Sequence, residues 1–563
     1  MYFSPYYSTL KKTQSILTFF LLLTGTSLFA QKLSFKITSK DSIEKTILTQ
    51  LKFKKKLDSK TAIQTQTDSV FQQLKLKGYF YSTVDTLIHK NDSISTLNLS
   101  LGKKIDSIHL QFPKQNKTIQ KKLFSTRNKL SIHFSELSNI LNTIKSYFKK
   151  EGKPFSKIKL SNIKLQKNNL FATIQINESE KRILDKIIVK GYENFPRSYL
   201  DHFLRLKKGK TFDQEAIFKT SRNLKSLKFI KEIKRPEVLF NTDSTTLYLY
   251  LEKTNVSSFD GLISLNSNPD NQDLLISGNI FLDLVNILNT GEELNIKWNA
   301  NGNDSQNFNL NTKIPYLFNS SFSNQTSFEI HKQDSTFLNS KFHTSLLYNI
   351  NSSTEVGLFF ETETSTNTLV INQSSIENYS TTFGGFNASY TIPKDHPLFK
   401  TKLRINLQYS LGSRTTNNNK QTQSKLNIES SYLHEINPRN SVYLHNETGI
   451  LFSNNYLVNE LYRIGGPNSI RGFEQQSIFT PKYSFFNLEY RFLTSKNSYL
   501  YSITDFGIIQ NTDKQTKNAF GYGIGYSFTL NKTIINIIAN AGNSNFNSTN
   551  KGFNLSLTLK NFF

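Results

Sequence analysis

The second half of the chain carries an alternation of apolar and polar residues that continues to the C-terminus. From about Ser257 onward it recurs in segments of about 8–12 residues, separated by turns rich in Asn, Ser, Thr and Gly. Residues 276–282, 403–411 and 553–559 are examples. Successive side chains of a strand point to opposite faces, so each segment has one apolar and one polar face. A transmembrane β-barrel has this pattern, with apolar residues toward lipid and polar residues toward the lumen.

The length of this region predicts the number of strands. Residues 255–563 span about 310 positions, and a tilted spanning strand takes roughly 9–11 residues. With turns and loops included, we predict a transmembrane β-barrel of about 16 antiparallel strands. Because unpaired backbone groups in hydrocarbon are costly, we expect the first and last strands to pair. A weak seam between them would give access from the lumen to the membrane.

A large soluble all-β domain, such as a sandwich or a propeller, is the competing interpretation. Aromatic residues make up 13% of the chain and several stand near the ends of strand patterns, as the interfacial girdles of a barrel do. The chain also stops on a strand pattern that ends in Phe562 and Phe563. Both features favour the barrel. The residues that we assign to girdles are Tyr462, Phe479, Tyr483, Tyr499 and Tyr522.

Residues 1–30 have the organisation of a secretory signal peptide. Lys11 and Lys12 supply the positive charge, residues 16–23 the apolar core, and residues 28–30 a cleavage end. A membrane-anchoring helix is the alternative, but the apolar run is shorter than the roughly 20 residues that span a bilayer. We therefore expect export from the cytoplasm.

Charge divides the remaining chain near Lys253. Of the formal net charge of +27, residues 31–253 carry +25, whereas residues 254–563 carry equal numbers of basic and acidic side chains. The basic segment would favour anionic lipid headgroups or acidic polypeptides. An ordinary solvated basic surface is the alternative. The chain has no cysteine, which excludes disulfides and thiolate metal sites.

Residues 31–254 mix helical and strand patterns in a weak repeat of about 75 residues. Each unit has an amphipathic helix, a turn and one or two alternating strands. In the third unit, we expect the helix that carries Ile217 and Leu224 to continue to Ile230. The pattern predicts small α+β domains and resembles the POTRA domain of bacterial outer-membrane assembly factors. The predicted domains are residues 31–103, 104–180 and 181–254.

The segment with the most specific pattern runs from Ile464 to Phe473 and contains Gly465, Gly466, Arg471 and Gly472. Two strand patterns follow it. The first contains Glu489 and the second contains Asp505, in the order Asp-Phe-Gly.

These three elements, in this order, resemble the BamA/TamA family of outer-membrane assembly and translocation proteins. That family has a Gly-Gly…Arg-Gly-[Phe/Tyr] signature in its sixth outer loop. The resemblance implies that Arg471, Gly472 and Phe473 belong to an inward loop that holds the barrel in its working conformation. With three POTRA-like units ahead of the barrel, the chain looks more like TamA than BamA.

Strand parity gives a physical account of the same residues. Alternation along 486–492 places Glu489 on the lumenal face. Asp505 belongs in the lumen as well, since a carboxylate facing lipid is costly. A guanidinium binds carboxylates in a fork geometry, so an inward-folded Arg471 would meet both. The alternative is an ordinary hairpin turn with Arg471 in solvent.

Two further residues are candidates at the end of the chain. Phe563 resembles the terminal aromatic residue that marks barrel precursors for assembly, although an ordinary girdle aromatic is the alternative. Gly552 would weaken pairing of the last strand with the first, or is simply a turn glycine.

No motif for catalysis, a metal or a cofactor stands out, so we predict that the protein is not an enzyme. We predict an outer-membrane protein with periplasmic N-terminal domains. It would capture unfolded outer-membrane or secreted clients and help them to insert into, or cross, the outer membrane. Its partners would be these clients and outer-membrane lipid, with room for periplasmic, inner-membrane or lipoprotein partners, and no nucleic acid. A passive channel with tethering modules, or a two-partner-secretion transporter, is the alternative.

Overall fold

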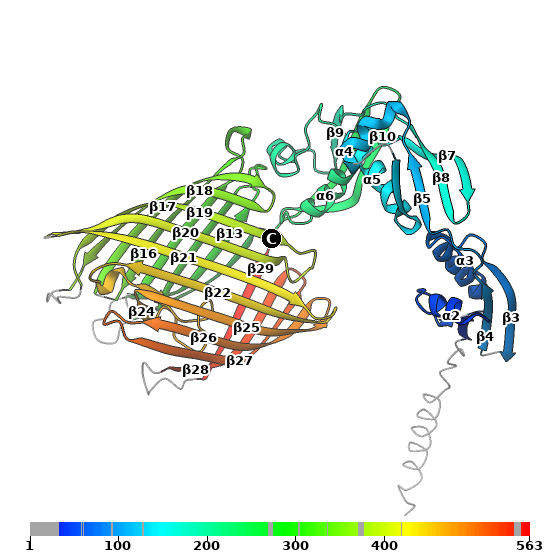
Figure 1. The fold of residues 1–563 in the computed structure, drawn as a ribbon. Helices are drawn as coiled ribbons and strands as arrows, with labels where there is room; N and C mark the ends of the chain where they lie inside the picture. Colours follow the sequence, from blue (N-terminus) through cyan, green and yellow to red (C-terminus); the bar gives the residue numbers. More distant parts are fainter. Residues whose placement is uncertain are drawn as a thin grey trace, which may run out of the picture. The chain divides into compact units, whose positions relative to one another are not determined.

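A computed structural model describes residues 33–57, 59, 61–91, 94–125, 129–267, 274–301, 305–334, 336–369, 376–417, 419–544 and 553–563 (Figure 1). The predicted signal peptide and Gly552 lie outside the described residues. The chain divides into two compact units, one ending at Arg182 and one beginning at Ile183. Within the described part, no helix has the length and apolar character needed to cross a membrane.

Sixteen antiparallel strands of the second unit close into a barrel, which confirms the predicted fold. Consecutive strands pair in sequence order, and β22 and β25 pair across a long loop that contains the short strands β23 and β24. The barrel strands are β12 (Ser258–Ser267), β13 (Leu274–Val285), β14 (Glu293–Asn301), β15 (Gln306–Ile314), β16 (Phe322–Gln333), β17 (Phe337–Asn351), β18 (Thr354–Asn367), β19 (Tyr379–Pro393), β20 (Thr401–Thr416), β21 (Lys420–Glu435), β22 (Asn440–Phe452), β25 (Lys482–Ser495), β26 (Ser498–Gln510), β27 (Thr516–Leu530), β28 (Thr533–Ser544) and β29 (Phe553–Phe562).

Side chains along the barrel strands alternate between an apolar outer face and a polar inner face. On β25, Phe486, Leu488 and Tyr490 are exposed on the outside, whereas Asn487 and Glu489 are buried inside. A closed barrel with an apolar outer belt is stable in a bilayer, where every backbone group must be paired within the protein. The protein is therefore an outer-membrane β-barrel with periplasmic N-terminal domains. Other exposed apolar residues of this outer face are Phe342, Leu358, Phe360, Phe386, Tyr390, Tyr432, Ile508, Phe520 and Ile524.

The assignment of aromatic residues to girdles was wrong for four positions. Phe479 lies on β24 (Ile478–Thr480), a short strand of the loop hairpin and not of the barrel wall. Tyr462 and Tyr483 face the lumen, where their ring centroids lie 5.3 Å apart. Tyr499 also shares the inner face and packs on Phe399, with ring centroids 5.0 Å apart. Tyr522 is exposed on the outer face, as predicted. Proximity to a strand end fits a girdle and a lumenal cluster equally well, and only the parity of the strand separates the two.

Three α+β modules precede the barrel, and each predicted range contains one sheet. The first has β1 (Leu33–Thr38), β2 (Lys56–Leu57), β3 (Thr83–Asn91) and β4 (Ile94–Ser100) in the order β2-β1-β4-β3, with α2 (Ser42–Thr49) and α3 (Thr61–Leu76). The second has β5 (Ser107–Gln111), β6 (Lys129–His133), β7 (Lys157–Gln166) and β8 (Asn169–Asn177) in the order β6-β5-β8-β7, with α4 (Lys117–Phe124) and α5 (Leu137–Lys150). The third has β9 (Lys186–Lys190), β10 (Ile230–Phe240) and β11 (Thr245–Lys253) in the order β10-β11-β9, with η3 (Tyr199–Phe203) and α6 (Gln214–Leu224).

The helix of the third module is shorter than the sequence predicts. Helix α6 ends at Leu224, and Ile230 begins strand β10. Backbone turns follow the helix, with the N–H of Ser226 donating to the carbonyl of Asn223. Apolar residues on both sides of this turn enter one core, so their spacing imitates a longer helix.

The third module shares that core with the periplasmic rim of the barrel. Tyr199 packs edge-on against Tyr316, in the turn between β15 and β16, with ring centroids 5.0 Å apart. The Tyr199 hydroxyl donates to the carbonyl of Gly291 at 3.3 Å. A Cβ at Gly291 would lie 2.3 Å from the Tyr199 ring, so only glycine permits this approach. The contact fixes the third module to the turns that follow β13 and β15.

The seam between the first and last strands is short. β12 and β29 pair at two positions, Ser258 with Phe562 and Phe259 with Asn561. Other neighbouring strands pair over eight positions (β14 with β15) to fifteen (β19 with β20). Strands near the seam are also shorter, since β12, β14, β15 and β29 have 9 or 10 residues and β20 and β21 have 16. The expected pairing is present but covers only the periplasmic end of the seam.

Candidate functional site

The sixth outer loop, residues 453–481, turns into the barrel rather than away from it. It contains the 3-10 turn η5 (Val458–Glu460) and the hairpin of β23 (Tyr462–Ile464) and β24 (Ile478–Thr480). The hairpin carries a tip, residues 465–477, with the predicted motif. We call the whole segment the lumenal loop, because its contacts are with inward-facing side chains.

Two glycines let the tip lie directly on the barrel wall. Gly472 has φ of +93°, and a Cβ there would lie 2.3 Å from the carbonyl carbon of Ala541 on β28. Gly521 on β27 faces the loop from the wall, and a Cβ there would lie 2.1 Å from the carbonyl oxygen of Arg471. Backbone therefore meets backbone at this point, which no other residue type permits. Gly465 and Gly466 take up positive φ where the tip begins.

Arg471 lies between two inward-facing carboxylates. Its Nε donates to Asp505 Oδ2 at 2.9 Å and its Nη2 to Asp505 Oδ1 at 2.6 Å, which is the fork geometry. Its Nη1 donates to Glu489 Oε1 at 2.5 Å. The backbone N–H of Arg471 adds a fourth bond, to Asp505 Oδ2 at 2.8 Å. The Arg471 and Glu489 side chains are 6% and 9% exposed, and that of Asp505 is fully buried.

Neighbouring charges stabilise this cluster. Burial by itself would lower the pKa of Arg471, but the hydrogen bonds and charges of Asp505 and Glu489 outweigh it and raise that pKa above its ordinary value. Arg491 donates from Nε to the second oxygen of Glu489 at 2.8 Å and lies over the ring of Tyr443, 3.9 Å from the centroid. Two arginines thus match two carboxylates, and the cluster is neutral in sum.

Apolar contacts complete the seat of the tip. Ile470 is fully buried and, with Phe473, joins a cluster that includes Phe485 on β25 and Ile509 on β26. Asn487 donates to the carbonyl of Ser469 at 2.8 Å. The tip therefore combines an ion cluster with a small hydrophobic core inside the barrel. Such a combination resists the entry of water to the buried charges.

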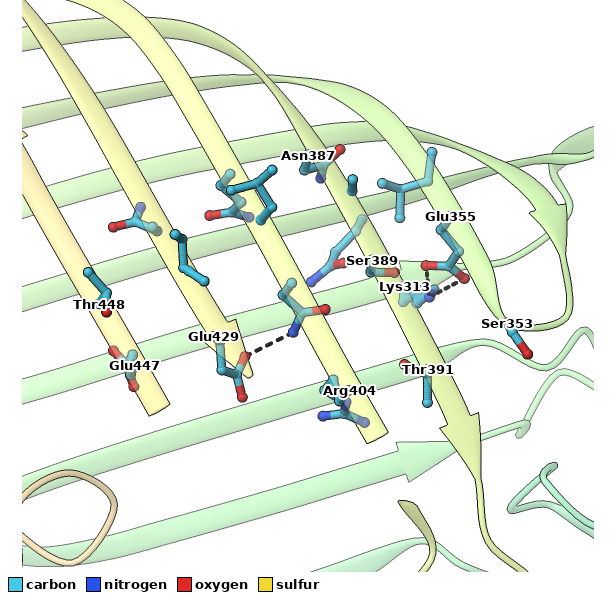
Figure 2. Close-up of a pocket in the computed structure, with 18 of the residues that line it drawn as sticks. Lys313, Ser353, Glu355, Asn387, Ser389, Thr391, Arg404, Glu429, Glu447 and Thr448 are labelled. Carbon is cyan, nitrogen blue, oxygen red and sulfur yellow. Dashed lines mark hydrogen bonds and ion pairs between the residues drawn. The ribbon is translucent and has the colours of Figure 1, made fainter. Parts of the chain in front are cut away.

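A polar cavity of about 650 Å³ lies against the inner wall (Figure 2). Lys313 on β15 reaches both oxygens of Glu355 on β18 at 3.0 Å. Asn406 donates to Glu429 at 2.9 Å. The side chains that line the cavity carry charges of both signs, and they come from strands β15 to β25. The polar lining suits a hydrated ligand better than an apolar one.

The structure brings together most, but not all, of the predicted site residues. Arg471, Glu489 and Asp505 meet directly, and Gly465, Gly466, Gly472 and Phe473 belong to the same tip. Phe563 lies apart from them, half exposed at the periplasmic end of the seam, where its N–H donates to the carbonyl of Ser257 at 3.0 Å. In the described part of the chain, no group of three or more His, Asp or Glu residues is placed to hold a metal ion.

Sequence reasoning missed a second polar cluster at the base of the lumenal loop. It contains Arg414, Asn459 and Glu460, all buried. The only sequence signal is parity, since Arg414 lies on the lumenal face of a long strand pattern. A buried arginine at such a position needs a carboxylate partner, but the sequence does not reveal which one.

Comparisons with known proteins agree with the barrel and its periplasmic modules. The model of the family described as haemolysin secretion/activation protein ShlB/FhaC/HecB matches residues 276–528. No curated protein matches the chain. Among solved structures, CdiB from Acinetobacter baumannii is similar with a TM-score of 0.52 and 13% identity, over 89% of this chain and 98% of that one.

Two other solved structures are similar at lower TM-scores. CdiB from Escherichia coli has a TM-score of 0.48 and 13% identity, over 89% of this chain and 97% of that one. BamA from Haemophilus ducreyi lacking POTRA domains 1–3 has a TM-score of 0.46 and 15% identity, over 81% and 98%. These findings do not single out TamA. The matched family is described as one of haemolysin secretion/activation proteins, and the similarity to CdiB supports the fold of the chain.

Proposed function

We propose that the protein receives client polypeptides in the periplasm and helps them to enter or cross the outer membrane. The lumenal loop, seated by Arg471 on Glu489 and Asp505, carries this proposal. A passive channel gains nothing from a neutral, fully hydrogen-bonded ion cluster that fixes a long loop inside its own lumen. Such a cluster is useful to a barrel that must hold one conformation until a client arrives.

The exposed edge of the first periplasmic sheet supports client capture. β3 is an edge strand, and Val84, Leu87 and Ile88 on it are each more than 40% exposed. An extended client segment can add to such an edge through backbone hydrogen bonds. Clients of this kind are unfolded outer-membrane or secreted proteins, whose strands are not yet paired.

The seam supports insertion into the membrane as the main outcome. Two paired positions leave most of β12 and β29 without each other as partners, so an incoming strand would meet few bonds to displace. The short strands beside the seam also shorten the hydrophobic wall there. At roughly 3.3 Å per residue, six fewer residues make a strand roughly 20 Å shorter. Lipid beside a short wall thins, which lowers the barrier to insertion.

A disulfide across the seam tests this proposal, because the chain has no cysteine of its own. Phe259→Cys with Asn561→Cys joins β12 to β29 at paired positions. Leu530→Cys with Thr533→Cys joins β27 to β28 at the same end and is the matched control. We expect the oxidised seam variant to lose insertion of client barrels into vesicles, and reduction to restore it. Full activity of the oxidised seam variant would contradict insertion through the seam.

Secretion through the lumen is a second candidate, which the match to a haemolysin secretion family favours. The polar cavity would then be part of the client's path. In that case the oxidised seam variant remains active in export of a secreted client, and obstruction of the cavity stops it. A large, steady conductance without any effect on clients would support a passive channel instead.

A further inference from the structure

The lumenal loop makes a second set of buried contacts, far from Arg471 on the barrel wall. Asn459, in η5, donates from Nδ2 to Ser365 Oγ on β18 at 2.7 Å and to the carbonyl of Glu377 at 2.8 Å. Its own carbonyl accepts from Asn339 Nδ2 on β17 at 2.7 Å and from the Tyr379 hydroxyl on β19 at 3.1 Å. Asn459 is 1% exposed. One loop residue therefore connects three adjacent strands.

The next residue adds an ion pair to the same wall. Glu460 pairs with Arg414 on β20, and both side chains are 4% exposed. Arg414 also donates to Gln421 at 2.8 Å, and Gln423 on β21 donates to the second oxygen of Glu460 at 3.0 Å. The backbone N–H of Leu457 donates to Glu460 at 3.0 Å. Among the described residues, the carboxylate that pairs with Arg414 comes from the loop.

The two sets of contacts share no residue and lie on different parts of the barrel. Asn459 and Glu460 contact strands β17 to β21, whereas the tip contacts β25 to β28. Strand β22 separates the two groups in the barrel order. The loop leaves β22, reaches back to β18 and then returns past its own base to β28. It consequently crosses the outer part of the lumen between these two sets of contacts, and Tyr462 of its hairpin donates to Asn427 on β21 at 2.8 Å between them.

We propose that Asn459 and Glu460 form a second anchor of the lumenal loop, and that the outer end of the lumen opens only when both anchors have released. Release of Arg471 alone frees the tip but leaves η5 across strands β17 to β21. This inference concerns the closure of the lumen. It rests on the proposed function in one respect, since we expect a client to release the anchors.

A reversible disulfide can hold or release the second anchor at will. Asn459→Cys with Ser365→Cys replaces the hydrogen bond between these side chains by a bond that reduction breaks. Because the chain lacks cysteine, no other disulfide forms within it. The bonds to the backbone carbonyl of residue 459 and the pair of Glu460 with Arg414 do not depend on the Asn459 side chain, so the cysteine pair is combined with Glu460→Gln. The full-length protein is placed in planar bilayers, and the frequency of ion-conducting openings is measured in an Arg471→Ala background.

We expect Arg471→Ala alone to open rarely. The reduced form with all four substitutions, Arg471→Ala, Glu460→Gln, Asn459→Cys and Ser365→Cys, should open at least tenfold more often, and oxidation should return it to the Arg471→Ala level. Asn454→Ala, an exposed position of the same loop, is the control and should leave the opening frequency unchanged.

Two results would overturn the second anchor. One is an equal opening frequency for the reduced quadruple variant and for Arg471→Ala. The other is an oxidised quadruple variant that opens as often as its reduced form. Circular dichroism of each variant shows whether the barrel is folded, and Arg471→Ala with Glu460→Gln provides an independent test without cysteine. No client is present in these measurements, so their failure is distinct from failure of the proposed function.

Discussion

Replacement of Arg471 by alanine should destabilise the folded barrel substantially. The substitution removes the two bonds that the Arg471 side chain donates to the fully buried Asp505, which then keeps the bond from the backbone N–H of residue 471, and it leaves Glu489 with Arg491 alone. Removal of one partner from a buried ion pair typically costs about 3–5 kcal/mol. We therefore expect the free energy of unfolding to fall by about 3–5 kcal/mol. Arg471→Lys keeps the charge but not the fork, and should lose about half as much.

The single tryptophan of the chain provides the assay. Trp298 lies on β14, away from the cluster, so its fluorescence reports on the wall rather than on the substitution. Denaturant unfolding of the protein in lipid vesicles gives the free energy for each variant. Arg439→Ala, at an exposed periplasmic turn, is the matched control and should change stability by no more than about 0.5 kcal/mol.

A double-mutant cycle tests the reasoning itself. Arg471→Ala with Asp505→Ala removes both charges, so the pair should lose less than the sum of the two single variants. Additive losses, or a loss below about 1 kcal/mol for Arg471→Ala, would refute the account of the cluster as a buried, mutually compensating set.

Three other outcomes follow from the same geometry. Asp505→Ala should destabilise the barrel more than Glu489→Ala in the same unfolding assay, because Asp505 accepts three bonds from Arg471 and Glu489 accepts one. Gly521→Ala should unseat the tip and expose it to protease, whereas Gly384→Ala, with no atom within 4 Å of its new Cβ, should not. Removal of Phe563 should slow assembly of newly exported protein into the outer membrane, measured by pulse labelling, while protein that has already folded keeps its stability.

The sequence was sufficient to predict the barrel, since lipid imposes a strict period of two over every strand. Parity then placed Glu489 on the inner face, the cost of a carboxylate in lipid placed Asp505 there, and the structure has both beside Arg471. Local patterns of this kind concern which face a residue occupies. They do not depend on where the strand lies in the barrel.

Contacts between strands far apart in the sequence could not be predicted in the same way. The partners of Asn459 come from β17, β18 and β19, and nothing in the sequence sets the distance that a 29-residue loop travels inside a lumen. The lengths of the strands beside the seam could not be predicted either, because the length of a strand depends on its pairing with both neighbouring strands. Each of these features is decided by packing rather than by period.

The shared core of Tyr199, Tyr316 and the carbonyl of Gly291 has a practical consequence for how the protein is divided. The predicted boundary near Lys253 separates the α+β modules from the barrel strands. A cut there would remove Tyr199, which packs on Tyr316 and contacts the turn after β13. The compact unit that contains the barrel therefore begins at Ile183 rather than at Ser258. A barrel expressed without the third module would therefore lack part of the core against which its periplasmic turns pack.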